Sequence, residues 1–187
     1  MLQVIRRAPL PRPLSKSFRP RLHGLRHYSK PVSHSLFKEN SLKNLIQDLS
    51  SSIQETSTEN NVKIREVMNL LRYYQSKEEQ WTKYALRDKD NNYTRNLVTN
   101  IKTHSNLLVL VWEPGKQSNI HGHPNTHCFM KILKGQLQEK LFDPTSSESD
   151  RVLKRTTTLP TNSVAYITDE LGLHQMKNPA ADIAVSL

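Results

Sequence analysis

Two histidines near the middle of the chain, His121 and His123, are separated by one residue and lie between apolar runs at residues 106–112 and 128–133. Both runs have the composition of strands. In a strand, residues i and i+2 point to the same face, so we expect both imidazoles to face one interior. Neutral imidazoles that converge are good ligands for a transition metal, and the pair therefore predicts a metal site.

The spacing of the residues around this pair resembles the first motif of the cupins. Gly115 stands six positions before His121, and Gly135 closes the stretch seven positions after Cys128. Cupins usually carry a glutamate ligand at the position of Cys128. The cysteine narrows the resemblance to the thiol dioxygenases, and among them to the eukaryotic type of cysteine dioxygenase.

A second, partial cupin motif lies at residues 172–178. His174 and Asn178 match its histidine and asparagine, whereas the Pro and Gly of the preceding turn are missing. The similarity to the family extends over roughly residues 45–187 and is dense at residues 93–98, 118–129 and 167–174.

The resemblance implies that His121, His123 and His174 bind Fe(2+). Three neutral ligands leave the charge of a divalent ion uncompensated, which makes room for an anionic ligand such as a substrate thiolate. The implied reaction adds O2 to the thiol of L-cysteine and gives cysteine sulfinic acid, on the route to hypotaurine and taurine. Three histidines would also hold zinc or nickel, so iron rests on the resemblance alone.

Arg95 and Tyr93 are the candidates for substrate recognition. A guanidinium can bind a carboxylate bidentately, and Tyr93, two positions earlier on the same strand face, can add a phenolic hydrogen bond. In the family an arginine at this position holds the cysteine carboxylate, while relatives that use 3-mercaptopropionate carry glutamine. Arg95 therefore favours L-cysteine. The alternative is a surface arginine next to a packing tyrosine.

Cys128 is the only cysteine, so an intrachain disulfide is not possible. In the eukaryotic enzymes the matching cysteine forms a thioether with a tyrosine near the iron. That tyrosine lies beyond the strand matched by residues 184–187, where the family's chains continue. We therefore expect a free thiol at Cys128. We also expect the last strands of the barrel to be missing, with open sheet edges and apolar surface as the result.

Helical patterns precede strand patterns along the chain. An apolar stripe at helical spacing begins after Ser41, at Leu42, Leu45, Ile46, Leu49 and Ile53. Two more helices are expected after Asn61 and at residues 78–86. Strands are expected at residues 93–98, 106–112, 128–133, 136–142, 151–159, 163–167 and 183–187. We predict an α+β chain, with N-terminal helices followed by a cupin-type β-barrel (jelly roll) that lacks its last strands.

The formal net charge of +10 originates mainly in the first 30 residues, which hold eight basic residues and no acidic ones. The remaining chain holds 19 basic and 17 acidic residues. An arginine-rich segment without acids is typical of a mitochondrial transit peptide, although a disordered basic tail is an alternative. We divide the chain into a presequence at residues 1–28, a linker at residues 29–40 and a cysteine dioxygenase domain at residues 41–187. The predicted location is the mitochondrial matrix, or the cytosol if the leader is not functional.

The expected partners are L-cysteine and O2. Nucleic acid is not expected because the basic charge is confined to the leader. A membrane span is not expected either, since no stretch approaches the ~20 apolar residues that cross a bilayer. We expect a monomer. Two alternatives stay open: a dioxygenase of another small thiol, such as 3-mercaptopropionate or cysteamine, and a catalytically inactive metal-binding cupin.

Overall fold

The computed structural model describes residues 1–5, 40–53, 64–102, 105–145 and 150–187. The helices are α1 (Leu42–Ser52), α2 (Ile64–Tyr73), α3 (Glu78–Trp81) and the short 3-10 helix η2 (Thr82–Tyr84). The strands are β1 (Leu2–Ile5), β2 (Tyr93–Ile101), β3 (Ser105–Trp112), β4 (Thr126–Lys134), β5 (Gln136–Phe142), β6 (Leu153–Pro160), β7 (Val164–Ile167), β8 (Leu173–Lys177) and β9 (Ala184–Ser186).

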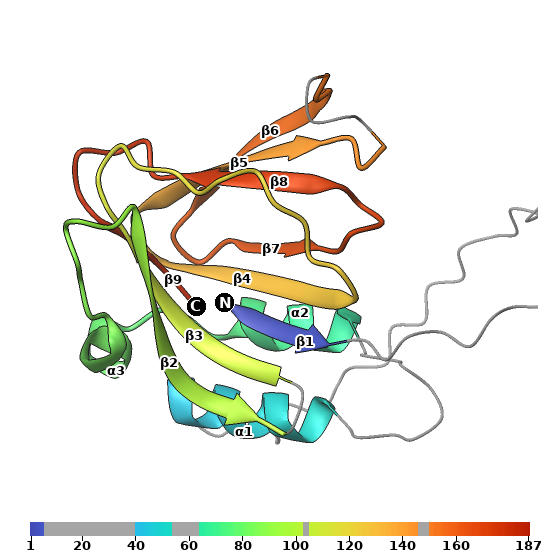
Figure 1. The fold of residues 1–187 in the computed structure, drawn as a ribbon. Coiled ribbons are helices and arrows are strands. Elements are labelled where there is room, and N and C mark those ends of the chain that lie inside the picture. Colours follow the sequence, from blue (N-terminus) through green and yellow to red (C-terminus); the bar gives the residue numbers. More distant parts are fainter. Residues whose placement is uncertain (6–39, 54–63, 103–104, 146–149) are drawn as a thin grey trace, which may run out of the picture.

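Two antiparallel sheets face each other (Figure 1). In the larger sheet β2 pairs with β3, both β1 and β9 lie between β3 and β4, and β7 pairs with the other edge of β4. The smaller sheet has the order β6-β5-β8. This double-sheet arrangement confirms the predicted α+β jelly roll and the seven expected strands, with boundaries that differ by a few residues. The strands β1 and β8 were not among the predicted ones.

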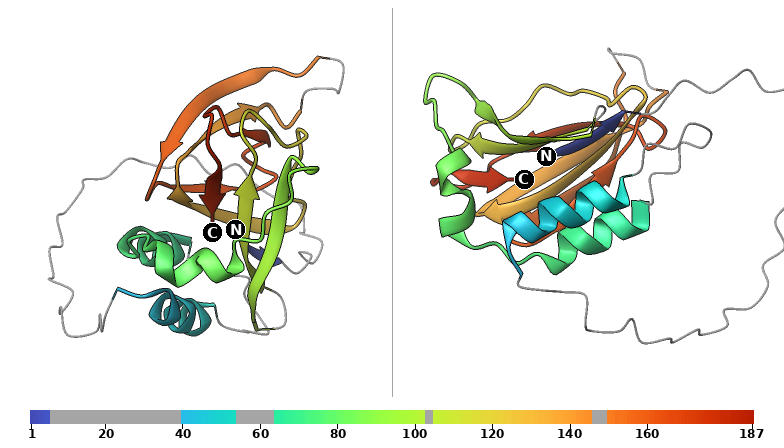
Figure 2. Two further views of the ribbon diagram at one scale, coloured as in Figure 1. Left: turned by 90° about the vertical axis from the view of Figure 1, so that its left-hand side faces the viewer. Right: turned by 90° about the horizontal axis from the view of Figure 1, so that it is seen from below.

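Helices α1 and α2 cover the outer face of the larger sheet (Figure 2). The predicted cap of α1 is confirmed, because the Ser41 side chain accepts a hydrogen bond of 3.2 Å from the amide of Asn44. The predicted stripe places Leu42, Leu45 and Leu49 in the core. The helix expected at residues 78–86 is shorter and ends at residue 84, and the predicted cap Asn61 lies outside the described residues.

Strand β3 is buried on both faces, which explains its continuous apolar sequence. Leu107 and Val109 pack toward the helices. Leu110 and Trp112 point the other way and pack against the smaller sheet. Cys128 of β4 also belongs to the core between the sheets, so β4 presents its thiol to the interior.

Strands β1 and β9 lie end to end between β3 and β4 (Figure 1). Both are antiparallel to β3, so they run in the same direction. Leu2 is opposite Leu107 on one side and Phe129 on the other. The open edge expected beyond residue 187 is therefore not found here, because residues 1–5, which the sequence analysis assigned to the leader, occupy this position. The other residues of the predicted presequence lie outside the described part of the chain.

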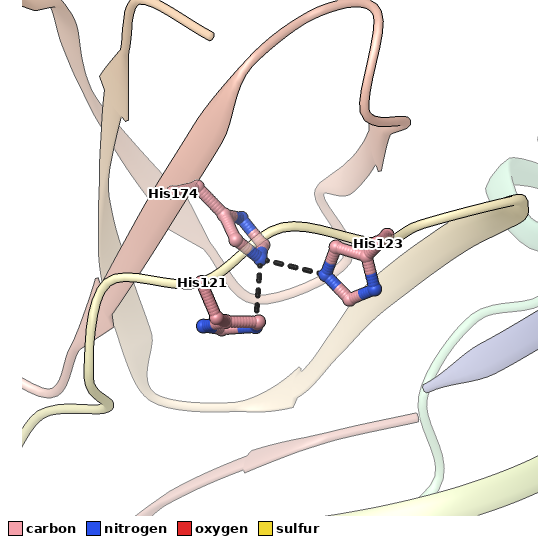
Figure 3. Close-up of side chains that lie close together, drawn as sticks. All are labelled: His121, His123 and His174. Atoms are coloured by element: carbon pink, nitrogen blue, oxygen red, sulfur yellow. Dashed lines mark hydrogen bonds between the residues drawn. The ribbon is translucent and has the colours of Figure 1, made fainter. Parts of the chain in front are cut away.

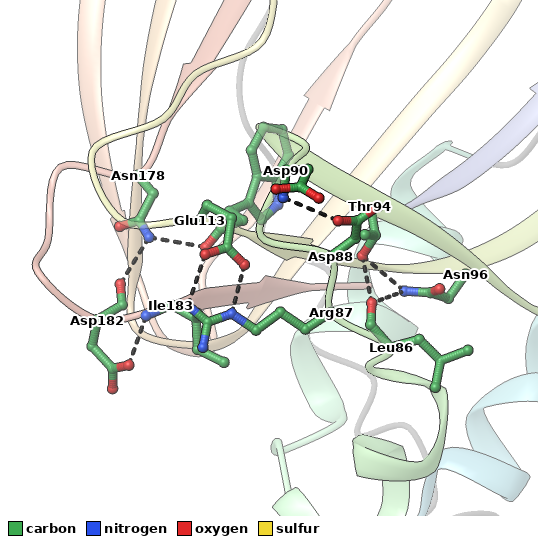
Figure 4. A network of polar contacts seen from close by, with 11 residues as sticks. Leu86, Arg87, Asp88, Asp90, Thr94, Asn96, Glu113, Asn178, Asp182 and Ile183 are labelled. Atoms are coloured by element: carbon green, nitrogen blue, oxygen red, sulfur yellow. Dashed lines mark hydrogen bonds and ion pairs between the residues drawn. The ribbon is translucent and has the colours of Figure 1, made fainter.

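A polar network joins the end of β3 to the start of β9 and to the segment after η2 (Figure 4). The Asn178 amide, which is fully buried, donates to the carbonyl oxygens of Trp112 (3.1 Å) and Asp182 (2.8 Å). Arg87 forms a bidentate ion pair with Glu113 at 2.6 and 2.7 Å, and this pairing lowers the pKa of Glu113. The asparagine of the second motif thus holds the strand ends together.

Candidate metal centre

Three imidazoles converge between the sheets (Figure 3). The Nε2 atom of His174 lies 3.0 Å from Nε2 of His123 and 3.2 Å from Nε2 of His121. The ligand atoms of all three lie within 4.8 Å of one another. His123 and His174 are buried and His121 is half-buried. The structure thus brings together the three predicted metal ligands.

The expectation that His121 and His123 share one face of a strand was wrong, because neither residue lies on a regular strand. They lie in the segment between β3 and β4, where His121 makes an isolated bridge to His174. The backbone amide of His121 donates to the carbonyl oxygen of His174, and the amide of His174 donates to the carbonyl oxygen of His121, each at 2.9 Å. This bridge attaches the segment to β8 and keeps both imidazoles on the inner side.

His174 reaches the site because β8 begins at a close approach to β5. Gly172 has a φ of +139°, and a Cβ atom there would collide with the carbonyl oxygen of Phe142. The pairing that follows sets Leu141 of β5 opposite His174. A glycine at residue 172 is therefore needed for the histidine to lie next to β5.

The Nδ1 atoms of His121 and His174 determine their tautomers. His121 Nδ1 is 2.9 Å from the carbonyl oxygen of Asn119, and His174 Nδ1 is 3.1 Å from Oε1 of Glu139. A carbonyl or carboxylate oxygen only accepts, so each Nδ1 carries the proton and donates it. Each Nε2 then directs its lone pair to the centre of the site.

Burial keeps His121 and His123 neutral. Desolvation is the main cause that lowers the pKa of His123 to about 3, and electrostatic interactions with His174, His121 and Arg95 lower it further. Desolvation also lowers the pKa of His121. Neutral imidazole is the form that binds a metal, so no proton has to be released from His121 and His123 as a whole before they coordinate at physiological pH.

The separations between the nitrogens fit a metal ion. Bonds of about 2.0–2.1 Å at angles between 90° and tetrahedral would separate two ligand nitrogens by about 2.8–3.4 Å. The separations of His174 Nε2 from the Nε2 atoms of His123 and His121, 3.0 and 3.2 Å, fall in this range. Three nitrogen donors without a carboxylate suit a late first-row divalent metal.

Glu139 was missed by the sequence analysis, although a signal was present. Its strand alternates, and Leu137 and Leu141 lie two positions before and after it on the same face. A glutamate on that face is directed into the core, where its exposed fraction is only 6%. A buried carboxylate needs a partner, and here it accepts from His174.

Arg95 lies close enough to the centre for its charge to lower the pKa values of both His121 and His123, as a smaller cause beside desolvation. It extends from β2 and is exposed. The described ion pairs do not include it. Tyr93, two residues earlier, stacks on Trp112 with the ring centroids 4.5 Å apart. The guanidinium is thus available to an anion that enters the site.

The chain matches a known family over residues 35–187, and that family is described as cysteine dioxygenase type I. The chain belongs to the cysteine dioxygenase type I family. Cysteine dioxygenase type 1 of Danio rerio is 39% identical over 145 residues, which cover 76% of this chain and 72% of the relative. The Homo sapiens protein of the same name is 38% identical over 144 residues, with the same coverage. A solved structure of oxalate oxidase aligns with a TM-score of 0.45 and 17% identity, over 56% of this chain and 53% of that one.

Membership of the cysteine dioxygenase family makes this chain an enzyme of the dioxygenase class with a cupin fold. Its Cys128 is a free cysteine with 1% exposure. Burial raises the pKa of Cys128 to about 12, against smaller opposing effects of the Met1 amino group and Arg95. Among the described residues, no helix combines the length and apolar character that crossing a membrane requires.

Replacement of Glu139 by glutamine should weaken metal binding by about tenfold, because a neutral amide is a weaker acceptor for the proton on His174 Nδ1. The measurement is the dissociation constant for Fe(2+) without oxygen, in competition with a chromophoric chelator. Glu79→Gln, on the exposed surface of α3, is the matched control. Equal affinities of Glu139→Gln and the control would show that this hydrogen bond does not tune the site.

Proposed function

We propose that this chain is an Fe(2+)-dependent cysteine dioxygenase, which adds both atoms of O2 to the thiol of L-cysteine and forms cysteine sulfinic acid. This reaction would supply the route to hypotaurine and taurine. The observation that carries the proposal is the convergence of His121, His123 and His174, without a carboxylate at the centre, in a chain of the cysteine dioxygenase type I family.

The three histidines would hold the iron through their Nε2 atoms. When bound, the ion would supply the redox chemistry and a positive charge that favours the deprotonated form of the substrate thiol. Because the imidazoles are neutral, the protein itself adds no negative charge at the ligand nitrogens. An anionic thiolate is therefore the complementary substrate group.

Arg95 and Tyr93 would hold the carboxylate of the substrate. The guanidinium is exposed at the edge of the site, and the carboxylate of an amino acid matches its paired N–H groups. Tyr93, fixed by its stacking on Trp112, would contribute a hydrogen bond from its hydroxyl group. Binding at both ends of the molecule would orient the sulfur toward the histidines.

The Cys128 thiol would stay protonated during the reaction, since its pKa of about 12 keeps the thiolate scarce at neutral pH. A protonated thiol is a poor metal ligand. Cys128 would therefore not compete with the sulfur of the substrate, and its role would be to fill space beside the site.

Oxygen consumption with detection of cysteine sulfinic acid tests the activity. The iron-loaded full chain should form one sulfinate for each O2 consumed with L-cysteine, and much less product with cysteamine or 3-mercaptopropionate. If cysteamine or 3-mercaptopropionate is turned over faster than L-cysteine, that thiol is the substrate and the proposal of L-cysteine is wrong. Iron and cysteine binding without oxygen uptake would instead identify an inactive metal-binding cupin.

Arg95→Gln should raise the KM for L-cysteine by at least tenfold and leave iron binding intact, because it removes a charge-assisted contact to the carboxylate. Steady-state kinetics at matched iron occupancy provide the measurement. The matched control is Arg72→Gln, on the exposed face of α2. If Arg95→Gln keeps the wild-type KM, the carboxylate is bound elsewhere.

We further propose that the basic leader directs the chain to the mitochondrial matrix, on the basis of its arginines and its lack of acidic residues. Cleavage before Ser29 would also remove strand β1. Cell fractionation followed by N-terminal sequencing should find a matrix form that begins at Ser29. Recovery of the chain from the cytosol alone, with Met1 retained, would contradict the targeting role.

A further inference from the structure

His123 has a polar neighbour on strand β1, on the side of its ring that faces away from the centre of the site. Nδ1 of His123 lies 3.5 Å from Nε2 of Gln3, which is half-buried on β1. The Nδ1 atoms of His121 and His174 each have an acceptor, Asn119 or Glu139. All three rings are thus contacted at the nitrogen that faces away from the centre, each by a different element.

The pairing of β1 explains why Gln3 faces this site. Gln3 is opposite Asn106 of β3 and Cys128 of β4, and residues directly opposite in a sheet point to the same side. Leu2 and Val4 therefore point to the other side, where both belong to the core beneath the helices. Gln3 is left on the inner face, beside the site.

The amide of Gln3 can serve either tautomer of His123. In the orientation described, Gln3 Nε2 donates to an unprotonated Nδ1, which leaves the ring proton on Nε2. That proton can be donated to His174 Nε2 at 3.0 Å, whose lone pair is free. Rotation of the Gln3 amide by 180° would put Oε1 in place of Nε2, and Nδ1 could then carry the proton and donate it.

We propose that Gln3 is a positioning residue of the metal centre: its amide oxygen accepts the Nδ1 proton of His123 and so directs Nε2 toward the metal. Without a metal, the amide nitrogen of Gln3 would donate to Nδ1 and His123 would hold the opposite tautomer. This inference rests on the proposed metal-binding role of the three histidines and applies to the chain that retains residues 1–5. Strand β1 thereby becomes part of the site, and its loss would weaken metal binding.

Variants at Gln3 test the hydrogen bond in the full chain, with an intact N-terminus verified by mass spectrometry. Gln3→Leu cannot accept, so we expect its dissociation constant for Fe(2+) without oxygen to rise about tenfold. Gln3→Glu keeps an acceptor and should bind Fe(2+) at least as tightly as the wild type, because a carboxylate oxygen accepts the Nδ1 proton more strongly than an amide oxygen does. Gln136→Leu, the same change at an exposed position on β5, should bind as the wild type does.

The tautomer itself can be measured in the wild type, which removes any dependence on the folding of variants. In protein with 15N-labelled histidine, the ring nitrogen shifts of His123 should show the proton on Nε2 without metal and on Nδ1 with Zn(2+) bound. Gln3→Leu with wild-type affinity, Gln3→Glu as weak as Gln3→Leu, or an unprotonated Nδ1 in the zinc form would each overturn the role of Gln3. A wild-type chain that binds neither ion would overturn both this inference and the proposed function.

Discussion

The site depends on one geometric constraint: three neutral imidazoles, each with a single lone pair, must direct that lone pair to a common point. A ring is fixed in this way only when its second nitrogen is also held. His121 is held by the backbone of its own segment and His174 by Glu139 of β5. The pairing of β5 with β8 and the bridge between His121 and His174 serve this arrangement, because they bring the segment, the strand and the carboxylate together.

Burial sets the charge of the site before a ligand arrives. Desolvation keeps His121 and His123 neutral and Cys128 protonated. The amino group of Met1 is also buried, and desolvation lowers its pKa to about 4. The charges near the ligand nitrogens are then the Glu139 carboxylate, which accepts from the outer nitrogen of His174, and the guanidinium of Arg95. A divalent ion that enters gains an anionic partner mainly from a substrate, which links metal binding to thiolate binding through simple electrostatics.

The sequence predicted those elements whose pattern is local. The stripe from Leu42 to Leu49 and the apolar runs of β3 and β4 depend only on which faces are buried, and the three histidines were identified by spacing and resemblance. Strands β1 and β8 were missed because each is formed by its partners: β8 by pairing with β5, and β1 by the space between β3 and β4. The four residues of β1 precede a basic, proline-rich segment, and their sequence does not indicate that they pair with β3 and β4, more than 100 residues later in the chain. Glu139 was missed for a different reason, since its place in an alternating strand was visible but its partner was not.

The docking of strand β1 is finely balanced. Fixing the backbone of five residues costs roughly 5–10 kcal/mol at 1–2 kcal/mol each. Burial of the side chains of Met1, Leu2 and Val4 returns roughly 5–9 kcal/mol, to which the net gain from the strand hydrogen bonds is added. Opposing free energies of such similar size leave the docked strand responsive to anything that favours it. Docking of β1 and binding of the metal are linked equilibria. If the metal ion binds more tightly when Gln3 holds His123, the bound ion stabilises the docked strand by the same free energy.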